Sequence, residues 1–232
     1  MKPLARKLII GVAVLAIGAV AGPWVYINLV KDDAPEALKL EPSAATTIVE
    51  ETVESTVQAS AVDGTWAIAT DSIVGYRVKE VIVAQSTEGV GRTSAVQGTL
   101  NIASGQVTEA QFSVDMTTLK SDSSRRDGQV NNRILDTATY PTATFTLKQP
   151  ITLTPEALAG SDLTTQATGT LTLRGVTKDI ELTLIARLAN DVIEVNGSIE
   201  IIFAEWSIPD PSISAIVVED RGQLEFLLRF TR

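Results

Sequence analysis

The sequence predicts a mainly β protein: an antiparallel barrel of about eight strands with one short helix, preceded by an N-terminal transmembrane helix. Two observations carry this prediction. Residues 8–30 hold no charged side chain, which matches the length and composition of a membrane span. From residue 62 onward, apolar and polar residues alternate with period two, the pattern of strands with one buried and one solvated face. The chain therefore divides into residues 1–30, an acidic linker at 31–61 and a β domain at 62–232.

The N-terminal segment places three basic residues before the uncharged stretch from Leu8 to Val30. As a helix with ~1.5 Å rise per residue, this stretch would reach about 34 Å, enough to cross a hydrocarbon core. A signal peptide cleaved after Ala19-Val20-Ala21 is the alternative. Trp24 and Tyr26 near the outer end, together with the apolar residues beyond that cleavage site, favour a retained anchor. We expect a single-pass protein of the cytoplasmic membrane with its C-terminal domain outside the cytoplasm.

The linker at 31–61 carries seven acidic residues, two prolines and no aromatic residue. Such a segment cannot bury enough apolar surface to offset the entropy lost on ordering. We therefore expect a solvated tether with an r.m.s. reach of roughly 30 Å.

The β domain contains five clear runs in which one parity is apolar. Their apolar positions are Phe112, Val114 and Met116; Ala143, Phe145 and Leu147; Leu171 and Leu173; Ile180, Leu182, Leu184, Ala186 and Leu188; and Leu224, Phe226, Leu228 and Phe230. Turn residues separate the strands at Glu88-Gly89, Ser104-Gly105, Gln149-Pro150, Arg174-Gly175, Asn190-Asp191 and Arg221-Gly222. Asn196-Gly197 is a hairpin signal, but the apolar parity continues through it, which favours one long strand.

An open sheet of this size would leave two edges and one apolar face bare, so we expect it to close into a barrel. The expected interior is almost wholly apolar, and a hollow barrel would take a long apolar molecule. The residues alone leave a hollow and a filled interior equally open. The candidate ligand-contacting residues are Tyr76, Val78, Leu100, Phe112, Val114, Met116, Phe145, Leu147, Leu171, Leu173, Leu182, Leu184, Phe203, Leu224, Phe226 and Leu228.

The stretch from Ser123 to Pro141 breaks the alternation with clustered arginines, aspartates and asparagines. Ser124 and Asp127 have capping-box spacing, and an apolar stripe follows at helical spacing: Val130, Ile134 and Leu135. We expect a short helix that closes one end of the barrel, with its stripe inward and its arginines outward. Arg125 and Arg126 either only solvate this helix or also contact an anionic head group.

The absence of histidine and cysteine excludes serine–histidine and cysteine–histidine catalysis and thiolate or imidazole metal sites. A net charge of −9 disfavours nucleic acid as a partner. We expect no enzymatic activity, no cofactor and no metal.

Four stretches, in order and at characteristic spacing, match one known pattern. They are TWAIATDSIVGYRVKE (Thr65–Glu80), AVQGTLNIASGQVTEAQFSVDMTTLKSDSSRRD (Ala95–Asp127), NNRILDTATYPTATFTL (Asn131–Leu147) and ATGTLTLRGVTKDIELTL (Ala167–Leu184). The chain from about Gly64 to Arg232 thereby resembles the YceI-like family, the lipid- or polyisoprenoid-binding barrels of bacterial envelopes.

The resemblance implies an elongated, lipocalin-like barrel that holds an amphiphilic chain in its tunnel, without catalysis or metal. We therefore expect a membrane-anchored extracytoplasmic barrel that binds, sequesters or carries a lipid with a long apolar tail, such as a polyisoprenoid. An envelope interaction module with a filled barrel and no ligand is the alternative.

The chain departs from the family pattern at polar positions. Asp71 stands where many members have histidine, and Gly128-Gln129 follows the arginine–aspartate pair, where histidine is frequent. A late arginine–acid–aromatic–glycine motif is present only as Ala204-Glu205-Trp206-Ser207. If these positions select the head group, this protein holds a different one.

Overall fold

A computed structural model describes residues 34–41, 62–82, 85–213 and 216–232. The transmembrane helix predicted at 8–30 lies outside these residues. Within the ranges described, no helix is both long and apolar enough to span a membrane.

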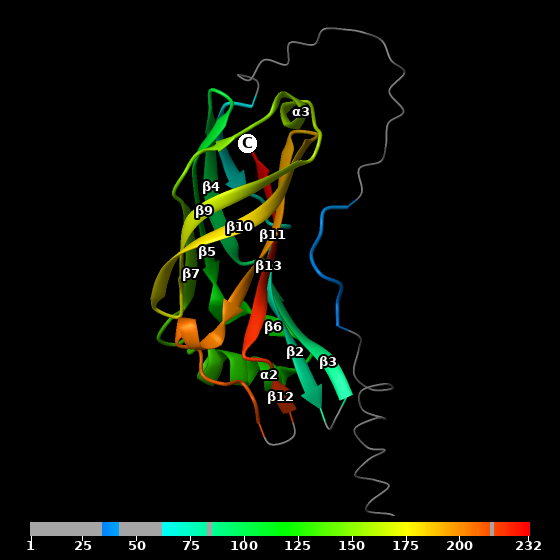
Figure 1. Ribbon diagram of the computed structural model, residues 1–232, viewed down its shortest axis with the longest axis vertical. Coiled ribbons are helices and arrows are strands. Elements are labelled where there is room, and N and C mark those ends of the chain that lie inside the picture. Colours follow the sequence, from blue (N-terminus) through cyan, green and yellow to red (C-terminus); the bar gives the residue numbers. More distant parts are fainter. Residues whose placement is uncertain (1–33, 42–61, 83–84, 214–215) are drawn as a thin grey trace, which may run out of the picture.

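The described part of the chain forms one antiparallel sheet of thirteen strands that closes on itself (Figure 1). The strands are β1 (Gly64–Ile68), β2 (Ile73–Ile82), β3 (Gln85–Thr93), β4 (Val96–Ala103), β5 (Gln106–Asp115), β6 (Lys120–Ser121), β7 (Thr142–Leu147), β8 (Ile151–Thr152), β9 (Leu163–Leu173), β10 (Val176–Ala189), β11 (Val192–Ile202), β12 (Ile216–Val218) and β13 (Arg221–Thr231).

Several of these strands are successive segments of one longer strand. β1 and β2 both pair with β13 on one side. On the other side, β1 pairs with β4 and β2 pairs with β3. β5 and β6 then continue the ladder along β4 and β3. In the described residues, β1/β2, β3/β4, β5/β6, β7, β9, β10, β11 and β13 thus form an eight-membered ring, closed where Ala67 pairs with Thr231 and Ile68 with Phe230. This confirms the predicted closed antiparallel barrel.

Short helices lie near the two ends of the barrel (Figure 1). α2 (Ser124–Gln129) continues into a π-helical turn at Val130–Ile134 and lies at one end. It follows the third member of the ring along the chain, close to the position predicted from the sequence, after about the fourth strand. α3 (Pro155–Leu158) lies at the other end and was not predicted, although Thr154 as N-cap and Pro155 in the first turn are ordinary start signals. The remaining helical turns are 3₁₀ turns at Met116–Thr118 and Phe203–Trp206.

The predicted capping box of α2 is wrong by one residue. Ser123 is the N-cap, and its hydroxyl accepts a hydrogen bond from the Arg126 amide. The Asp127 carboxylate instead accepts hydrogen bonds from the amide and hydroxyl of Ser121, at 2.8 and 2.7 Å. Asp127 therefore ties the start of the helix to β6.

Two predicted turns lie within strands, because glycine there makes room for a bulky neighbour instead of bending the chain. Gly89 lies in β3 and Gly222 in β13. A Cβ on Gly222 would lie 2.7 Å from Cγ1 of Val78, and one on Gly89 would lie 3.3 Å from its Cγ2. The Val78 side chain is thus flanked by two glycines.

The interpretation of Asn196-Gly197 as part of one long strand is confirmed, because β11 runs through it. A Cβ on Gly197 would lie 2.6 Å from Cζ of Phe226, its partner on β13. The glycine is therefore explained by the aromatic ring that lies over it.

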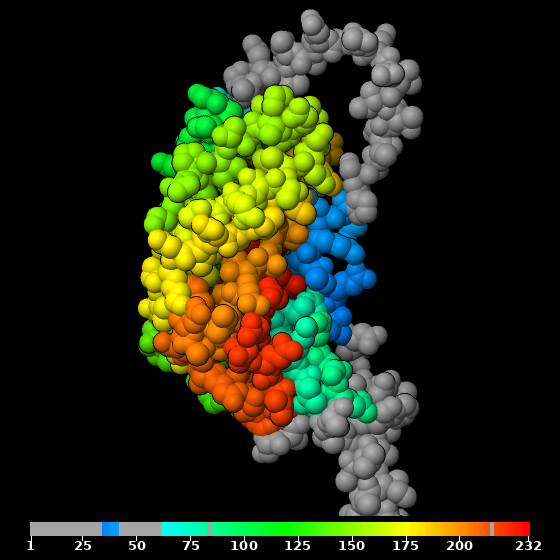
Figure 2. Space-filling model, viewed as in Figure 1, coloured from blue at the N-terminus to red at the C-terminus, as the bar shows by residue number. Residues whose placement is uncertain are grey.

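Residues 34–41 run along the outside of the barrel, beside β2, β3 and β13 (blue in Figures 1 and 2). We call this segment the strap. Its main-chain carbonyls accept hydrogen bonds from barrel side chains: Pro35 from Arg77 (2.6 Å), Glu36 from Arg92, Leu38 from Asn196 (2.9 Å) and Glu41 from Arg187 (2.7 Å). This part of the linker is therefore not the solvated tether that its composition indicates.

Candidate functional site

The barrel encloses a cavity of about 630 Å³. This volume lies in the range of sites for small organic ligands. All sixteen residues predicted from strand parity line it, and their contact with a ligand stays a prediction: Tyr76, Val78, Leu100, Phe112, Val114, Met116, Phe145, Leu147, Leu171, Leu173, Leu182, Leu184, Phe203, Leu224, Phe226 and Leu228.

Two buried clusters hold the walls of the cavity in place. One surrounds Trp66 and Phe230, which are both 0% exposed, and includes Leu158 of α3 among its partly buried members. The other surrounds Phe203 and Trp206 and takes in residues from the π-helical turn. Trp66 and Trp206 are thus core residues, and the Trp66 indole donates a hydrogen bond to the Val62 carbonyl at 3.0 Å.

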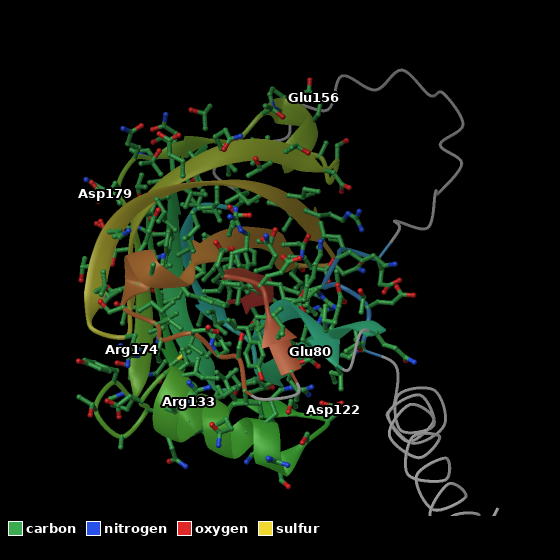
Figure 3. All side chains as sticks on the ribbon, turned by 60° about the horizontal axis from the view of Figure 1, so that its bottom comes forward. Glu80, Asp122, Arg133, Glu156, Arg174 and Asp179 are labelled. Atoms are coloured by element: carbon green, nitrogen blue, oxygen red, sulfur yellow. The ribbon has the colours of Figure 1, made fainter. Side chains whose placement is uncertain are left out.

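Charged groups meet at the α2 end of the cavity, where Figure 3 shows Glu80 and Asp122. Glu80 is only 5% exposed, and its Oε1 accepts a hydrogen bond from Nη2 of Arg126 at 2.8 Å. Arg126 also pairs with Asp122. Burial lowers the pKa of Arg126, but the carboxylates of Glu80 and Asp122 outweigh this effect and raise it. At this end of the cavity, the positive charge of Arg126 is therefore held in place and neutralised by two carboxylates.

Tyr76 lines the cavity beside this ion pair, where Gly91 leaves room for its ring. A Cβ on Gly91 would lie 2.3 Å from Cε1 of Tyr76. Burial raises the pKa of the Tyr76 hydroxyl, so the group stays a neutral donor at all physiological pH values. Among the described residues, this hydroxyl has no hydrogen-bond partner. It is free to bind a polar group inside the cavity.

The two candidate head-group arginines both line the cavity, but in different states. Arg125 is exposed and makes neither a hydrogen bond nor an ion pair with any described residue. Arg126 does not point outward as predicted, because the buried carboxylate of Glu80 requires a counter-ion. The apolar stripe of Val130, Ile134 and Leu135 lines the cavity, as expected.

The sequence prediction missed several polar lining residues, of which Glu80 is buried beside Arg126; the others are Ser123, Gln129, Thr144, Arg187 and Gln223. The signal for Glu80 was present, because it shares the inward parity of Tyr76 and Val78 along β2. Of the positions where the chain departs from the family pattern, Gln129 lines the cavity. Asp71 and Glu205 instead pair with Arg229 and Lys178.

Within the described ranges, no three acidic side chains lie close enough together to hold a metal ion.

Comparison with known proteins places the barrel in a family. A family model for the YceI-like domain matches residues 66–230, more than half of the chain. A search of curated proteins gave no significant match.

Solved structures share the fold. A polyisoprenoid binding domain from Saccharophagus degradans, implicated in plant cell wall breakdown, superposes with a TM-score of 0.57 at 22% sequence identity, covering 73% of this chain and 98% of that domain. Burkholderia cenocepacia BcnA superposes with a TM-score of 0.51 at 18% identity, covering 67% of this chain and 95% of its own. The matched family model and the closed barrel together show that the chain belongs to the YceI-like family.

Proposed function

We propose that this protein is a membrane-anchored, extracytoplasmic barrel that binds an amphiphilic lipid with a long apolar tail, of polyisoprenoid type, and sequesters or carries it. The observation that carries the proposal is the apolar cavity of about 630 Å³, whose lining includes Glu80, Arg125 and Arg126 at the α2 end and Arg187 further along the barrel. The tail would lie among the apolar walls, and the polar end would lie near Tyr76, Arg125 and Arg126.

The size of the cavity favours an occupied barrel. At about 630 Å³ the cavity lies within the range of sites that bury most of a small organic ligand. Water is a poor filling, because it needs two to four polar partners and the walls are mostly apolar. An apolar tail fits these walls, and its burial is favourable by about 0.8 kcal/mol for each CH₂ group removed from water.

The family relatives agree with this proposal. The Saccharophagus degradans neighbour is described as a polyisoprenoid binding domain. The anchor and the extracytoplasmic position rest on the sequence, through the uncharged stretch Leu8–Val30 and the basic residues before it. We propose no enzymatic role, since the polar groups beside the cavity include no histidine or cysteine nucleophile.

The test is native mass spectrometry of the full chain, expressed in its host and released from membranes by a mild detergent. We expect a reproducible adduct of lipid mass that survives collisional removal of the detergent. A protein that is always free of such an adduct would contradict the proposal.

Two neighbouring positions on β10 give a matched pair of variants. Leu184 lines the cavity, whereas Thr183 is exposed on the outer face of the same strand. Leu184→Trp should fill part of the cavity and lower the occupied fraction, while Thr183→Trp should leave it unchanged. Equal adduct fractions in both variants would place the lipid outside the barrel.

The alternative of an interaction module requires a filled barrel. The cavity of about 630 Å³ supports lipid binding over that alternative.

A further inference from the structure

Exposed apolar side chains gather at one end of the barrel. In the part of the chain that the structure describes, the large hydrophobic residues classed as exposed are Val81, Ile213 and Val217, at 38%, 37% and 62%. Val217 of β12 pairs with Val81 of β2, and Ile213 forms a bridge with Ile216 of β12. We call these three residues the tip. Such residues scattered singly need no explanation, but their clustering indicates a contact surface.

Beyond Glu80, the β2–β12 pair is apolar on both of its faces. Ile82 and Ile216, which are partners across the pair, line the cavity, while Val81 and Val217 lie on the opposite, solvent-facing side. A sheet that meets water on one face normally alternates apolar and polar residues. Here the alternation is lost, and residues 81–87 and 211–218 contain no charged side chain. The outer face of this pair therefore lacks an apolar partner within the described structure.

The tip lies at the same end of the barrel as the charged groups of the cavity. Val218 of β12 pairs with Glu80, so the tip begins one residue beyond the buried ion pair of Glu80 and Arg126. α2 and β12 lie together at this end in Figure 1, and α3 lies at the other. A surface that docks through the tip would therefore lie next to the polar end of the cavity.

The strap fixes the direction in which the chain leaves the barrel. Pro35 is bonded to Arg77 of β2, and Glu41 is bonded to Arg187, which also pairs with Asp162 after α3. The strap therefore runs from β2 towards the α3 end, and its N-terminal side faces the tip (Figure 2). The described segment therefore begins, at Ala34, on the side of the tip.

The chain between the strap and the predicted anchor is too short to hold the barrel far from a membrane. Val30, the last residue of the uncharged stretch, lies five residues before Pro35, and so at most about 18 Å from it. β2 extends five residues beyond Arg77 to Ile82, or about 17 Å at ~3.3 Å per residue. The two lengths match, so a chain extended along β2 would bring the outer end of the predicted anchor to the level of Ile82.

We propose that the tip docks on the surface of the lipid bilayer, with the strap holding the barrel in that orientation and the α2 end of the cavity against the head groups. This inference rests on the anchor included in the proposed function. Val81, Ile213 and Val217 insert among the lipids, and the neighbouring cavity opens towards the layer that supplies its ligand.

The test uses the full chain in phosphatidylcholine–phosphatidylglycerol nanodiscs. The sequence has no cysteine, so Val217→Cys accepts a single environment-sensitive fluorophore without further changes. Glu156→Cys, on exposed α3 at the opposite end, is the matched control (Figure 3). We expect blue-shifted emission at position 217 and quenching by nitroxide-labelled lipid several-fold stronger than at position 156. With the fluorophore moved to Ile213→Cys, the additional change Val217→Asp should abolish most of that quenching.

Equal quenching at positions 217 and 156 would overturn the proposal. A blue shift at position 217 that depends on protein concentration and not on the nitroxide lipid would also overturn it, since the occupant would then be a second copy. A chain that does not elute with the nanodiscs would remove the anchor and the docking together. Native mass spectrometry of the same sample tests lipid binding in the cavity separately. A lipid adduct found without contact between the tip and the membrane would support the proposed function and contradict the docking.

Discussion

The ion pair between Glu80 and Arg126 provides the sharpest test of how the polar end of the cavity is built. Arg126→Gln removes the cation that lies 2.8 Å from a side chain of which only 4% is exposed. Breaking a buried pair from one side costs about 3–5 kcal/mol, and the 18% exposure of Arg126 places the expected loss near the lower value, about 3 kcal/mol. Glu80→Gln should cost only about 1 kcal/mol, because Arg126 keeps Asp122 as a partner.

The double variant should be much less harmful than the sum of the single ones. It removes both charges of the buried pair, and Asp122, which loses Arg126, is exposed to solvent. We therefore expect a total cost of about 1–2 kcal/mol and a coupling of roughly 2 kcal/mol. Urea unfolding of the full chain in detergent, followed by the fluorescence of Trp66 and Trp206, measures all four proteins. Costs that add within about 0.5 kcal/mol would refute the argument, because the two groups would then be independent.

Two further predictions concern stability. Gly91→Ala should destabilise the barrel by about 1–3 kcal/mol, since its Cβ would lie 2.3 Å from the Tyr76 ring. In contrast, a Cβ on Gly128 in α2 would meet no atom within 4 Å, so Gly128→Ala should stabilise the protein by about 0.5–1 kcal/mol. Thermal unfolding of both variants measures this difference. The hydrogen bond from Arg187 holds the pKa of Asp162 below its usual value. Its stabilising contribution is therefore present above the unfolded pKa and lost as pH falls through the folded one, so Asp162→Asn should give a flatter stability curve below about pH 4.

Strand parity predicted the cavity wall because a barrel interior follows directly from the alternation of side chains. The inward positions of β10 and β13, for example, were readable from the sequence without any knowledge of pairing. Closure of the ring was also predictable, because an open sheet of about eight strands leaves two edges and one apolar face bare, and a barrel removes both.

The wrong predictions have a common physical origin. They depend on contacts between residues that are far apart in the sequence, which a local pattern does not show. Gly89 has the signature of a turn, yet it is a strand residue that makes room for Val78. Arg126 was expected to be solvated, because its partner Glu80 lies 46 positions away in the chain. The strap is a further case, since its main-chain carbonyls bind four side chains of the barrel and its composition carries no sign of this.

The polar end of the cavity should decide which lipid is held. A lipid tail that leaves the bilayer for the cavity exchanges one apolar environment for another, so the gain of about 0.8 kcal/mol per CH₂ relative to water largely cancels. What does not cancel is the environment of the head group, which leaves water and other lipids for the neighbourhood of the Tyr76 hydroxyl and of the Arg125 guanidinium, which pairs with none of the described residues. A charge-assisted hydrogen bond from Arg125 contributes about 1.5–3 kcal/mol, roughly a ten- to hundredfold preference. Arg125→Gln should therefore change the spectrum of lipids found by native mass spectrometry more than the total occupancy, and an unchanged spectrum would mean that the arginine only solvates α2.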